Sequence, residues 1–396
     1  MTKWPIVTLS ELCDIQIGRT PSRAEPRFWG PGKAWLSIAD MNQGRELCTT
    51  KETITDLAVE ECRCRVVAAG TLVFSFKLSV GKVGVLQSAM CTNEAIAALP
   101  IRDSGRLESA YLYHALRALD LRGVGEKAVK GVTLNTQSLA RLKIPLPPLA
   151  EQRRIAAMLD LTDRIRRNRR EASRGMAKLL AGAYDSLVGP KNKHYVDWPE
   201  QSLADLAERN PGSIRTGPFG SALRHSEFID RGVAVLGIDN AVRNRFAWAQ
   251  RRFISDVKFD QFRRYEVKPG DVIITIMGTT GRSAVVPEDI PRAISTKHLA
   301  VITPDRTRII PLFLSHAIHS NSAVSRQISS ANYGAIMAGL SVGIIKRLRV
   351  RLPPLEIQEQ FASVVRTIYQ IMDRMEDASL RSDRLRGAVE QLGFRE

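Results

Sequence analysis

A group of potentially reactive charges lies around residue 260. Asp260, followed by Glu266-Val267-Lys268, superficially matches the carboxylate and Glu-x-Lys arrangement of metal-dependent nucleases. Lys268, however, opens the sequence Lys-Pro-Gly-Asp, which is typical of a turn that leads into a strand. We therefore expect these charges to belong to a turn and not to a metal site.

The histidines offer no complete set of metal ligands. His316 and His319 lie on one predicted helix without a third ligand, whereas a zinc site needs at least three protein ligands. His114 matches His316 in an internal repeat, and both fit a helix residue that packs or forms hydrogen bonds. We expect the chain to bind no metal.

The sequence lacks the motifs that hold nucleotides or methyl donors. It contains no GxxxxGKS/T loop, no strand-bounded GxGxxG, and no Asn-Pro-Pro-aromatic or Asp-Pro-Pro-aromatic tetrapeptide of the kind that amino-methylating enzymes use. The pairs Pro147-Pro148 and Pro353-Pro354 are flanked by leucines, so they present no amide or carboxylate to a flipped base. We predict that the chain itself has no catalytic residue and binds no cofactor.

The charge of the chain indicates a polyanionic partner. Its 58 Lys and Arg residues against 41 Asp and Glu give a formal net charge of +17 and a pI of about 10.0, so nucleic acid is the expected partner. The densest basic cluster is "RIRRNRR", Arg164 to Arg170, which could equally be the solvated face of a long helix.

Composition predicts a cytoplasmic protein with no membrane segment. The N-terminal "MTKWPIVTLS" lacks the apolar core of a signal peptide, and no run approaches the length of a membrane span. The five cysteines show no disulfide or metal spacing, which favours reduced thiols.

The elements that must position these residues occur twice. Four stretches of the first half of the chain have counterparts in the second, which indicates a duplication. The pairs are "WPIVTLSEL" at Trp4 with "WPEQSLADL" at Trp198, "WLSIADM" at Trp35 with "VLGIDNA" at Val235, "AGTLVFSFKLSVGKVGVL" at Ala69 with "PGDVIITIMGTTGRSAVV" at Pro269, and "YLYHAL" at Tyr111 with "FLSHAI" at Phe313.

Each copy ends in an LPPL junction followed by a long helix. The prolines must stop any strand before them and cannot continue a helix. After the second junction a seven-residue pattern predicts one long coiled-coil seam, formed by Phe361, Val364, Ile368, Ile371, Met375, Ala378, Ser382, Leu385, Val389 and Leu392. The first helix shows a weaker form of this seam and ends at Gly189-Pro190. We expect the two helices to pair with each other, the alternative being that each packs on its own domain.

Inside each copy, short strands alternate with one helix and enclose a matching loop. Leu72 to Phe76 and Val272 to Ile276 read as strands that leave through "KLSVGK" and "GTTGR" into a second apolar run. Lys82 and Arg282 then hold matching positions, where they could meet phosphates or base edges.

These loops supply the most specific binding candidates. We assign Lys82 to a phosphate because an ammonium is a point charge, and leave Arg282 open between phosphate and base. The hydroxyls of Thr279 and Thr280 are the better candidates for direct base contacts. The alternative is an ordinary polar turn carrying one basic residue.

Two segments carry a resemblance to a known family. "LNTQSLARLKIPLPPLAEQ", Leu134 to Gln152, and "LSVGIIKRLRVRLPPLEIQEQ", Leu340 to Gln360, resemble the junctions of specificity subunits of type I restriction-modification systems. "GRTPS" at Gly18, with "AWLSIADM" after it, and the run from Lys268 to Val286 are similar as well, so the resemblance covers essentially the whole chain. "SFKLSVGKV" departs from the usual small polar loop through Lys77-Leu78.

The resemblance implies the architecture. We expect a mixed α/β fold with two repeated target-recognition domains joined by two long antiparallel coiled-coil helices in a pseudo-twofold arrangement. The expected bounds are 1–149 for the first domain, 150–190 for the central helix, 191–354 for the second domain and 355–396 for the C-terminal helix.

The resemblance also implies the partners. Each domain would read one half of a split double-stranded DNA site, and the chain would dock two methyltransferase subunits and, in the larger assembly, restriction subunits. S-adenosylmethionine, ATP and Mg²⁺ would be used by those partners. The rival readings are a self-contained DNA methyltransferase or nuclease, and a duplicated DNA-binding repressor or spacer. The DNA-contacting candidates are Arg19, Thr20, Lys77, Ser79, Lys82, Lys127, Lys130, Arg215, Thr216, Thr279, Thr280, Arg282, Lys297 and Tyr333.

Overall fold

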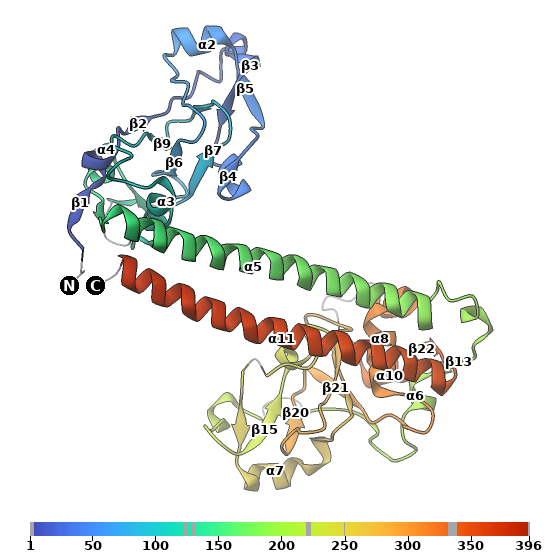
Figure 1. Cartoon of the computed structure of the whole chain (residues 1–396). Helices are drawn as coiled ribbons and strands as arrows, with labels where there is room; N and C mark the ends of the chain where they lie inside the picture. The colour runs from blue at the N-terminus through green and yellow to red at the C-terminus, as the bar shows by residue number, and fades with distance from the viewer. Residues whose placement is uncertain are drawn as a thin grey trace. The chain divides into compact units, whose positions relative to one another are not determined.

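The chain divides into two compact units, each of which contains part of both long helices. The computed structural model describes residues 4–121, 126–128, 131–218, 223–248, 250–331 and 339–394. Unit 1 comprises Met1–Arg170 and Glu376–Glu396, and unit 2 comprises Glu171–Met375 (Figure 1). Within the described ranges, no helix is long and apolar enough to cross a membrane.

Unit 1 is built on a five-stranded sheet whose central strands are fully buried. Its order is β2 (Gln16–Ile17), β9 (Ile96–Leu99), β6 (Leu72–Ser75), β7 (Val83–Leu86) and β4 (Glu46–Leu47). A second sheet contains β5 (Glu52–Ile54), β3 (Trp29–Leu36) and β8 (Cys91–Thr92). Two pairs complete the unit, β1 (Ile6–Thr8) with β12 (Lys143–Pro145) and β10 (Glu126–Ala128) with β11 (Gly131–Thr133). Its short helices are α1 (Leu9–Leu12), α2 (Asp56–Glu61), α3 (Ser109–Ala118) and α4 (Thr136–Ala140).

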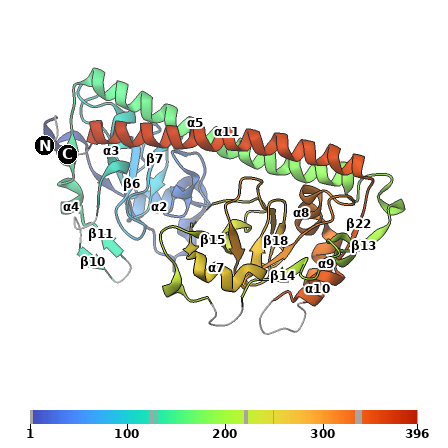
Figure 2. The same cartoon turned by 90° about the horizontal axis from the view of Figure 1, so that it is seen from below.

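Unit 2 repeats this plan. One four-stranded sheet has the order β14 (Ile214–Thr216), β21 (Leu299–Ile302), β18 (Val272–Thr275) and β19 (Ser283–Val285). The other has the order β16 (Phe253–Ile254), β15 (Val233–Leu236), β20 (Ala293–Ser295) and β17 (Glu266–Val267), and β13 (Glu200–Ser202) pairs with β22 (Arg349–Arg351). The helices are α6 (Leu203–Leu206), α7 (Asp256–Phe262), α8 (Pro311–Ser320), α9 (Ser322–Ala331) and α10 (Val342–Arg347). Helix α7 packs on the sheet that contains β15, and α8 on the one that contains β18 (Figure 2).

The duplication predicted from the sequence is visible in the strand pairing. In both units the central strand, β6 or β18, pairs antiparallel with the strand that follows it and with a later strand, β9 or β21. The first strand of each unit pairs with the strand that precedes the LPPL junction, in the registers Ile6 with Pro145 and Glu200 with Arg351. The two ends of each domain therefore meet at one short antiparallel pair.

Both predicted long helices are present. α5 spans Leu149–Ala183, 35 residues, and α11 spans Leu355–Phe394, 40 residues. At about 1.5 Å rise per residue they are rods of roughly 50 to 60 Å. A π-helical turn at Tyr184–Val188 ends α5, and Gly189 follows where a Cβ would lie only 2.8 Å from the Cα of Asp185. The predicted end at Gly189 is confirmed, and a side chain at this position would clash with the preceding turn.

The helices run antiparallel within each unit. In unit 1, Arg166 of α5 pairs with Asp383 of α11 at 3.2 Å, while Arg169, further along α5, donates to the carbonyl of Ala378, earlier in α11. In unit 2 the ring of Tyr184, just past α5, packs edge-on against Phe361 near the start of α11, with centroids 5.7 Å apart.

The predicted seam of α11 is partly apolar and partly polar. Phe361 and Ile368 are buried in unit 2, and Val389 is buried in unit 1. Leu385 and Leu392, predicted to lie in the seam, are instead 49% and 71% exposed. Ile371, also predicted to lie in the seam, is 38% exposed, and an ion pair of Arg166 with Asp383 forms part of the contact between the helices.

One buried glutamine fastens each LPPL junction. In unit 1 the Gln152 amide donates to the carbonyls of Arg106 and Pro147, and its oxygen accepts from the Glu108 N–H, all at 2.9 Å. In unit 2 the Gln358 side chain makes the same three contacts, at 3.3, 2.8 and 2.9 Å, with the carbonyls of Arg308 and Pro353 and the N–H of Ile310. Glu108 and Ile310 are the N-cap residues of α3 and α8. The repeated motif therefore joins the long helix to the domain helix through the proline turn.

Candidate nucleic-acid interface

The two matching loops have the same internal hydrogen bonds. In the β6–β7 loop the Ser75 hydroxyl donates to the carbonyl of Ser79 at 2.5 Å and accepts from the Lys82 N–H at 2.9 Å. In the β18–β19 loop the Thr275 hydroxyl donates to the carbonyl of Thr279 and accepts from the Arg282 N–H at 3.0 Å. The prediction that these segments are hairpin loops with matching ends is confirmed.

The departure of the first loop from the usual composition has a backbone consequence. Leu78 has φ +63°, a left-handed conformation that is costly for a residue with a Cβ, and its counterpart Gly278 has φ +73°. The Leu78 side chain is 71% exposed. The sequence change thus leaves the fold of the loop intact and places an exposed apolar side chain at its tip.

The two basic residues that follow these loops differ in their surroundings. The Lys82 ammonium donates to the carbonyl of Ile38 at 3.0 Å and to the side-chain oxygen of Asn42 at 2.8 Å. Arg282 is exposed. The phosphate role assigned to Lys82 stays a prediction, and this ammonium also ties β7 to the segment that follows β3.

The remaining candidates of unit 1 lie on the turn after β2 and in the loop. Arg19 is exposed and donates weakly to the carbonyl of Cys62 at 3.4 Å, and the Thr20 hydroxyl donates to Glu94. The Lys77 ammonium lies 5.3 Å from the ring centre of Phe76. Lys130, Tyr333 and the side chain of Lys127 lie outside the described residues.

Arg215 is held inside unit 2. Its guanidinium forms an ion pair with Asp271 at 2.8 Å and donates to the carbonyl of Glu266 and the hydroxyl of Thr303 at 2.5 and 3.0 Å. The side chains of Arg215 and Asp271 are only 14% and 1% exposed. Neighbouring Thr216 is buried. These contacts give Arg215 a structural role, which the sequence analysis did not foresee because the partners lie far along the chain.

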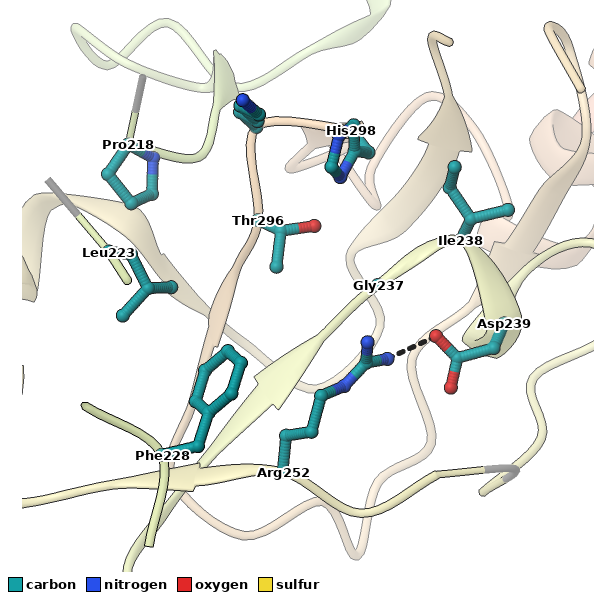
Figure 3. A pocket seen from close by; sticks show the side chains of 10 residues that line it. Pro218, Leu223, Phe228, Gly237, Ile238, Asp239, Arg252, Thr296 and His298 are labelled. Carbon is teal, nitrogen blue, oxygen red and sulfur yellow. Dashed lines mark hydrogen bonds and ion pairs between the residues drawn. The ribbon is translucent and has the colours of Figure 1, made fainter. Parts of the chain in front are cut away.

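A hollow of about 310 Å³ lies between the turns of unit 2 (Figure 3). Lys297, a predicted contact residue, is one of its lining residues. Three further lining residues, Asp239, Arg252 and His298, were not predicted from the sequence. Asp239 and Arg252 form an ion pair, and the imidazole of His298 lies near the positive charges of Lys297 and Arg252. The matching segments "WLSIADM" and "VLGIDNA" could have pointed to this site, because Asp239 lies in the second of them.

The histidine in this hollow has a lowered pKa. Partial burial lowers the pKa of His298, and the positive charges of Lys297 and Arg252 lower it further. A neutral imidazole presents one donor and one acceptor, which suits hydrogen bonding to a base edge.

The charges that resembled a nuclease site are ordinary surface and turn contacts. Asp260 pairs with Arg263 at 2.9 Å on the surface. In the predicted turn, the Lys268 N–H donates to the Asp271 carboxylate at 2.9 Å, and β18 follows. Within the described residues, no group of three or more His, Cys, Asp or Glu side chains could hold a metal.

The matching histidines pack and form hydrogen bonds, as expected. His114 Nε2 lies 2.7 Å from Asp160 of α5, and His316 Nε2 lies 3.1 Å from the Tyr369 hydroxyl of α11. Each therefore links a domain helix to a long helix. Burial lowers the pKa of His316 to about 4.

The basic run Arg164 to Arg170 is in part the solvated helix face that the sequence left open, while its contact with DNA stays a prediction. Arg166 and Arg169 face α11, whereas Arg164, Arg167 and Arg170 are exposed. The run thus combines helix pairing with a solvated basic face.

Comparison with known proteins identifies the family. The type I restriction modification DNA specificity domain matches residues 1–172 and 196–379. The chain belongs to this family. The two matched segments correspond to the two copies of the repeat, and the α/β fold with two repeated domains and two long helices expected from the sequence is confirmed.

Relatives of this specificity family span most of the chain. The MjaIX specificity subunit of Methanocaldococcus jannaschii is 19% identical over 93% of this chain and 87% of its own length. The EcoBI specificity subunit of Escherichia coli is 23% identical over 72% of this chain and 63% of its own. The crystal structure of the type I S subunit from M. genitalium shares the fold, with a TM-score of 0.65, 15% identity, and coverage of 100% of this chain and 97% of that one.

Proposed function

We propose that the chain is the non-catalytic DNA-specificity subunit of a type I restriction-modification complex, and that each domain reads one half of a bipartite, asymmetric site. The observation that supports this is the duplication itself. Two domains share strand pairing, loop hydrogen bonds and junction, yet differ in the side chains that their turns display. One frame with two different surfaces suits recognition of two unlike half-sites.

The chain would act through partners. It would dock two methyltransferase subunits, which transfer a methyl group from S-adenosylmethionine to N6 of adenine, and restriction subunits that use ATP and Mg²⁺. The net charge of +17 favours association with DNA, and cytoplasmic placement follows from that partner. Arg164, Arg167 and Arg170 of α5 and Arg282 after the β18–β19 loop are exposed basic residues that would contribute to this association.

A methyl-transfer assay with the separate components tests the proposal. Labelled S-adenosylmethionine and duplexes with randomised sites are incubated with the chain, with its methyltransferase subunit, and with both. We expect methylated adenine only in the mixture, confined to one two-part motif. Methyl transfer by the chain alone, or transfer by the mixture without any motif, would overturn the proposal.

A further inference from the structure

The hollow of unit 2 gathers side chains from several turns around one base-sized space. Pro218, Leu223 and Phe228 form its apolar part, and Asp239, Arg252, Thr296, Lys297 and His298 form its polar part. Figure 3 shows the Arg252 guanidinium and the Thr296 hydroxyl directed into the space between these segments. A hollow with an apolar wall and convergent polar groups has the general make-up of a binding site.

The contacts of Arg252 fix the direction of its guanidinium but do not occupy all of its N–H donors. One end of its guanidinium is paired with Asp239, whose second oxygen accepts from the Gln250 N–H at 3.2 Å. Its Nε is buried and has no hydrogen-bond partner among the described residues. The arginine is therefore fixed in direction and retains donors for another group.

Thr296 supplies a second unused group on the opposite wall. Its hydroxyl is buried and has no hydrogen-bond partner in the described part of the chain. Its backbone is fixed, since its N–H donates to the carbonyl of Leu236 at 2.9 Å and its own carbonyl accepts from the Leu299 N–H at 3.1 Å. Two unsatisfied groups on a rigid frame indicate that a ligand completes the hydrogen bonding here.

Unit 1 has the same backbone frame at the corresponding place. The Asn93 N–H donates to the carbonyl of Leu36 at 3.1 Å, as Thr296 does to Leu236, and the Asn93 carbonyl accepts from Ile96 at 3.0 Å. The Asp40 carboxylate caps the Ser37 N–H at 2.9 Å. In unit 2, Asn240 caps Gly237 in the same way at 2.8 Å.

On this shared frame the charges of the lining residues differ. The pairing of β3 with β5 and of β15 with β16 places Glu52 where unit 2 has Arg252, because Trp35 pairs with Glu52 and Val235 donates to the Arg252 carbonyl. The alignment of the two turns gives two more pairs of corresponding positions. The pairs are Ala39 with Asp239, Glu52 with Arg252, and Glu94 with Lys297.

We propose that this hollow is the base-reading site of the second domain, and that Arg252, held in place by Asp239, donates to the acceptor edge of a guanine in the major groove. The inference rests on the proposed function. The acceptors O6 and N7 of guanine match the paired donors of a guanidinium, and Lys297 adds a third donor. In unit 1 the Arg23 guanidinium donates to both carboxylate oxygens of Glu52, and the Thr20 hydroxyl donates to Glu94, so the two units present different groups at this place.

The test uses the complete methyltransferase complex and duplexes randomised across the half-site read by the second domain. Arg252→Gln removes the paired N–H donors of the guanidinium. The control is Arg251→Ala, because the neighbouring Arg251 is exposed and its guanidinium carbon lies 5.3 Å from the ring centre of Trp248. We expect Arg252→Gln to lower the preference for guanine at one position by about 10-fold to 100-fold. Arg251→Ala should leave the motif unchanged.

A triple variant, Asp239→Ala with Arg252→Glu and Lys297→Glu, places the residues of unit 1 at these three positions and has a readout, a change of the preferred base, that a folding defect would not produce. It should shift that position from guanine toward cytosine or adenine. An unchanged motif in Arg252→Gln, a loss that is equal for all sequences, or a half-site without guanine would overturn the inference. A wild-type complex that shows no motif at all would overturn the proposed function instead.

Discussion

At the scale of single residues, the two cations after the loops should behave differently. Arg282 is exposed, whereas the Lys82 ammonium is bonded to Ile38 and Asn42. If Arg282 contacts a phosphate, Arg282→Ala should weaken binding to all duplexes alike and lower the salt slope by about one counterion. Lys82→Ala should mainly destabilise unit 1, by about 0.5–1.5 kcal/mol, because it removes hydrogen bonds to groups that are only partly buried.

The measurement is the affinity of the assembled methyltransferase for specific and scrambled duplexes over a salt series, with thermal unfolding of both variants. Loss of preference at one base in Arg282→Ala would instead show a base contact. Unchanged affinity, slope and motif in both variants would place the loops away from DNA.

The buried His316 should make the stability of unit 2 depend on pH. Burial lowers its pKa from 6.5 to about 4, so the folded state keeps it neutral while the unfolded state takes up a proton below pH 6.5. Its contribution is fully present above pH 6.5 and is lost as the pH falls toward 4, by about 3 kcal/mol in total. We expect His316→Gln to reduce this pH dependence of the unfolding free energy, and the buried neighbour His319, whose pKa burial also lowers, to supply the rest.

The matched control for this titration is His194→Gln, since the His194 side chain is 60% exposed. This variant should keep the wild-type slope between pH 6.5 and 4 in denaturant unfolding. An equal slope in His316→Gln and the wild type would mean that another group carries the acid sensitivity.

At the scale of elements, the junction glutamine should carry more stability than its position on a polar helix suggests. Gln358 is fully buried and makes three hydrogen bonds to backbone groups. Gln358→Ala should lower the unfolding free energy by on the order of 3 kcal/mol, because it leaves buried N–H and C=O groups unpaired. Gln360→Ala, two residues further along α11 and exposed, should change it by less than about 0.5 kcal/mol.

Denaturant unfolding measures the free energy of unfolding of Gln358→Ala and Gln360→Ala. Equal effects would show that water satisfies the groups around Gln358. Gln152→Ala should repeat the loss in unit 1, since Gln152 makes the same contacts.

The elements were largely predictable because they depend on local patterns. The LPPL prolines and the heptads placed both long helices, and the apolar runs placed β6 and β18 with their loops. The role of the glutamine in the motif was not predictable, because two of its three partners are backbone groups about 45 to 50 residues earlier in the chain. The ion pairs of Arg215 and Arg252 could not be predicted either, since the sequence does not show which carboxylate each guanidinium contacts.

At the scale of the whole molecule, the strand pairs that close each domain make it an exchangeable part. The register of Glu200 with Arg351 brings both ends of the second domain together, and Arg351 also donates to the carbonyl of Trp198 at 3.0 Å. The core of unit 2 is formed by its own residues, including those that α11 contributes from Phe361 and Val365. A segment from Trp198 to Leu352 can therefore be replaced without cutting a core strand.

We expect that replacing Trp198 to Leu352 by the equivalent segment of a relative changes one half of the methylated motif and leaves the other half intact. Each domain belongs to its own compact unit, and the hollow of the second domain is lined only by residues of unit 2, so we expect the bases read by one domain not to depend on the other. The motif is read by sequencing methylated DNA from cells that carry the exchanged chain with its methyltransferase. The reciprocal replacement of Trp4 to Leu146, whose ends meet through the pair of Ile6 with Pro145, should change the opposite half. If either exchange altered the bases of both halves, recognition would be a joint property of the two domains, and the division of labour inferred from the duplication would be wrong.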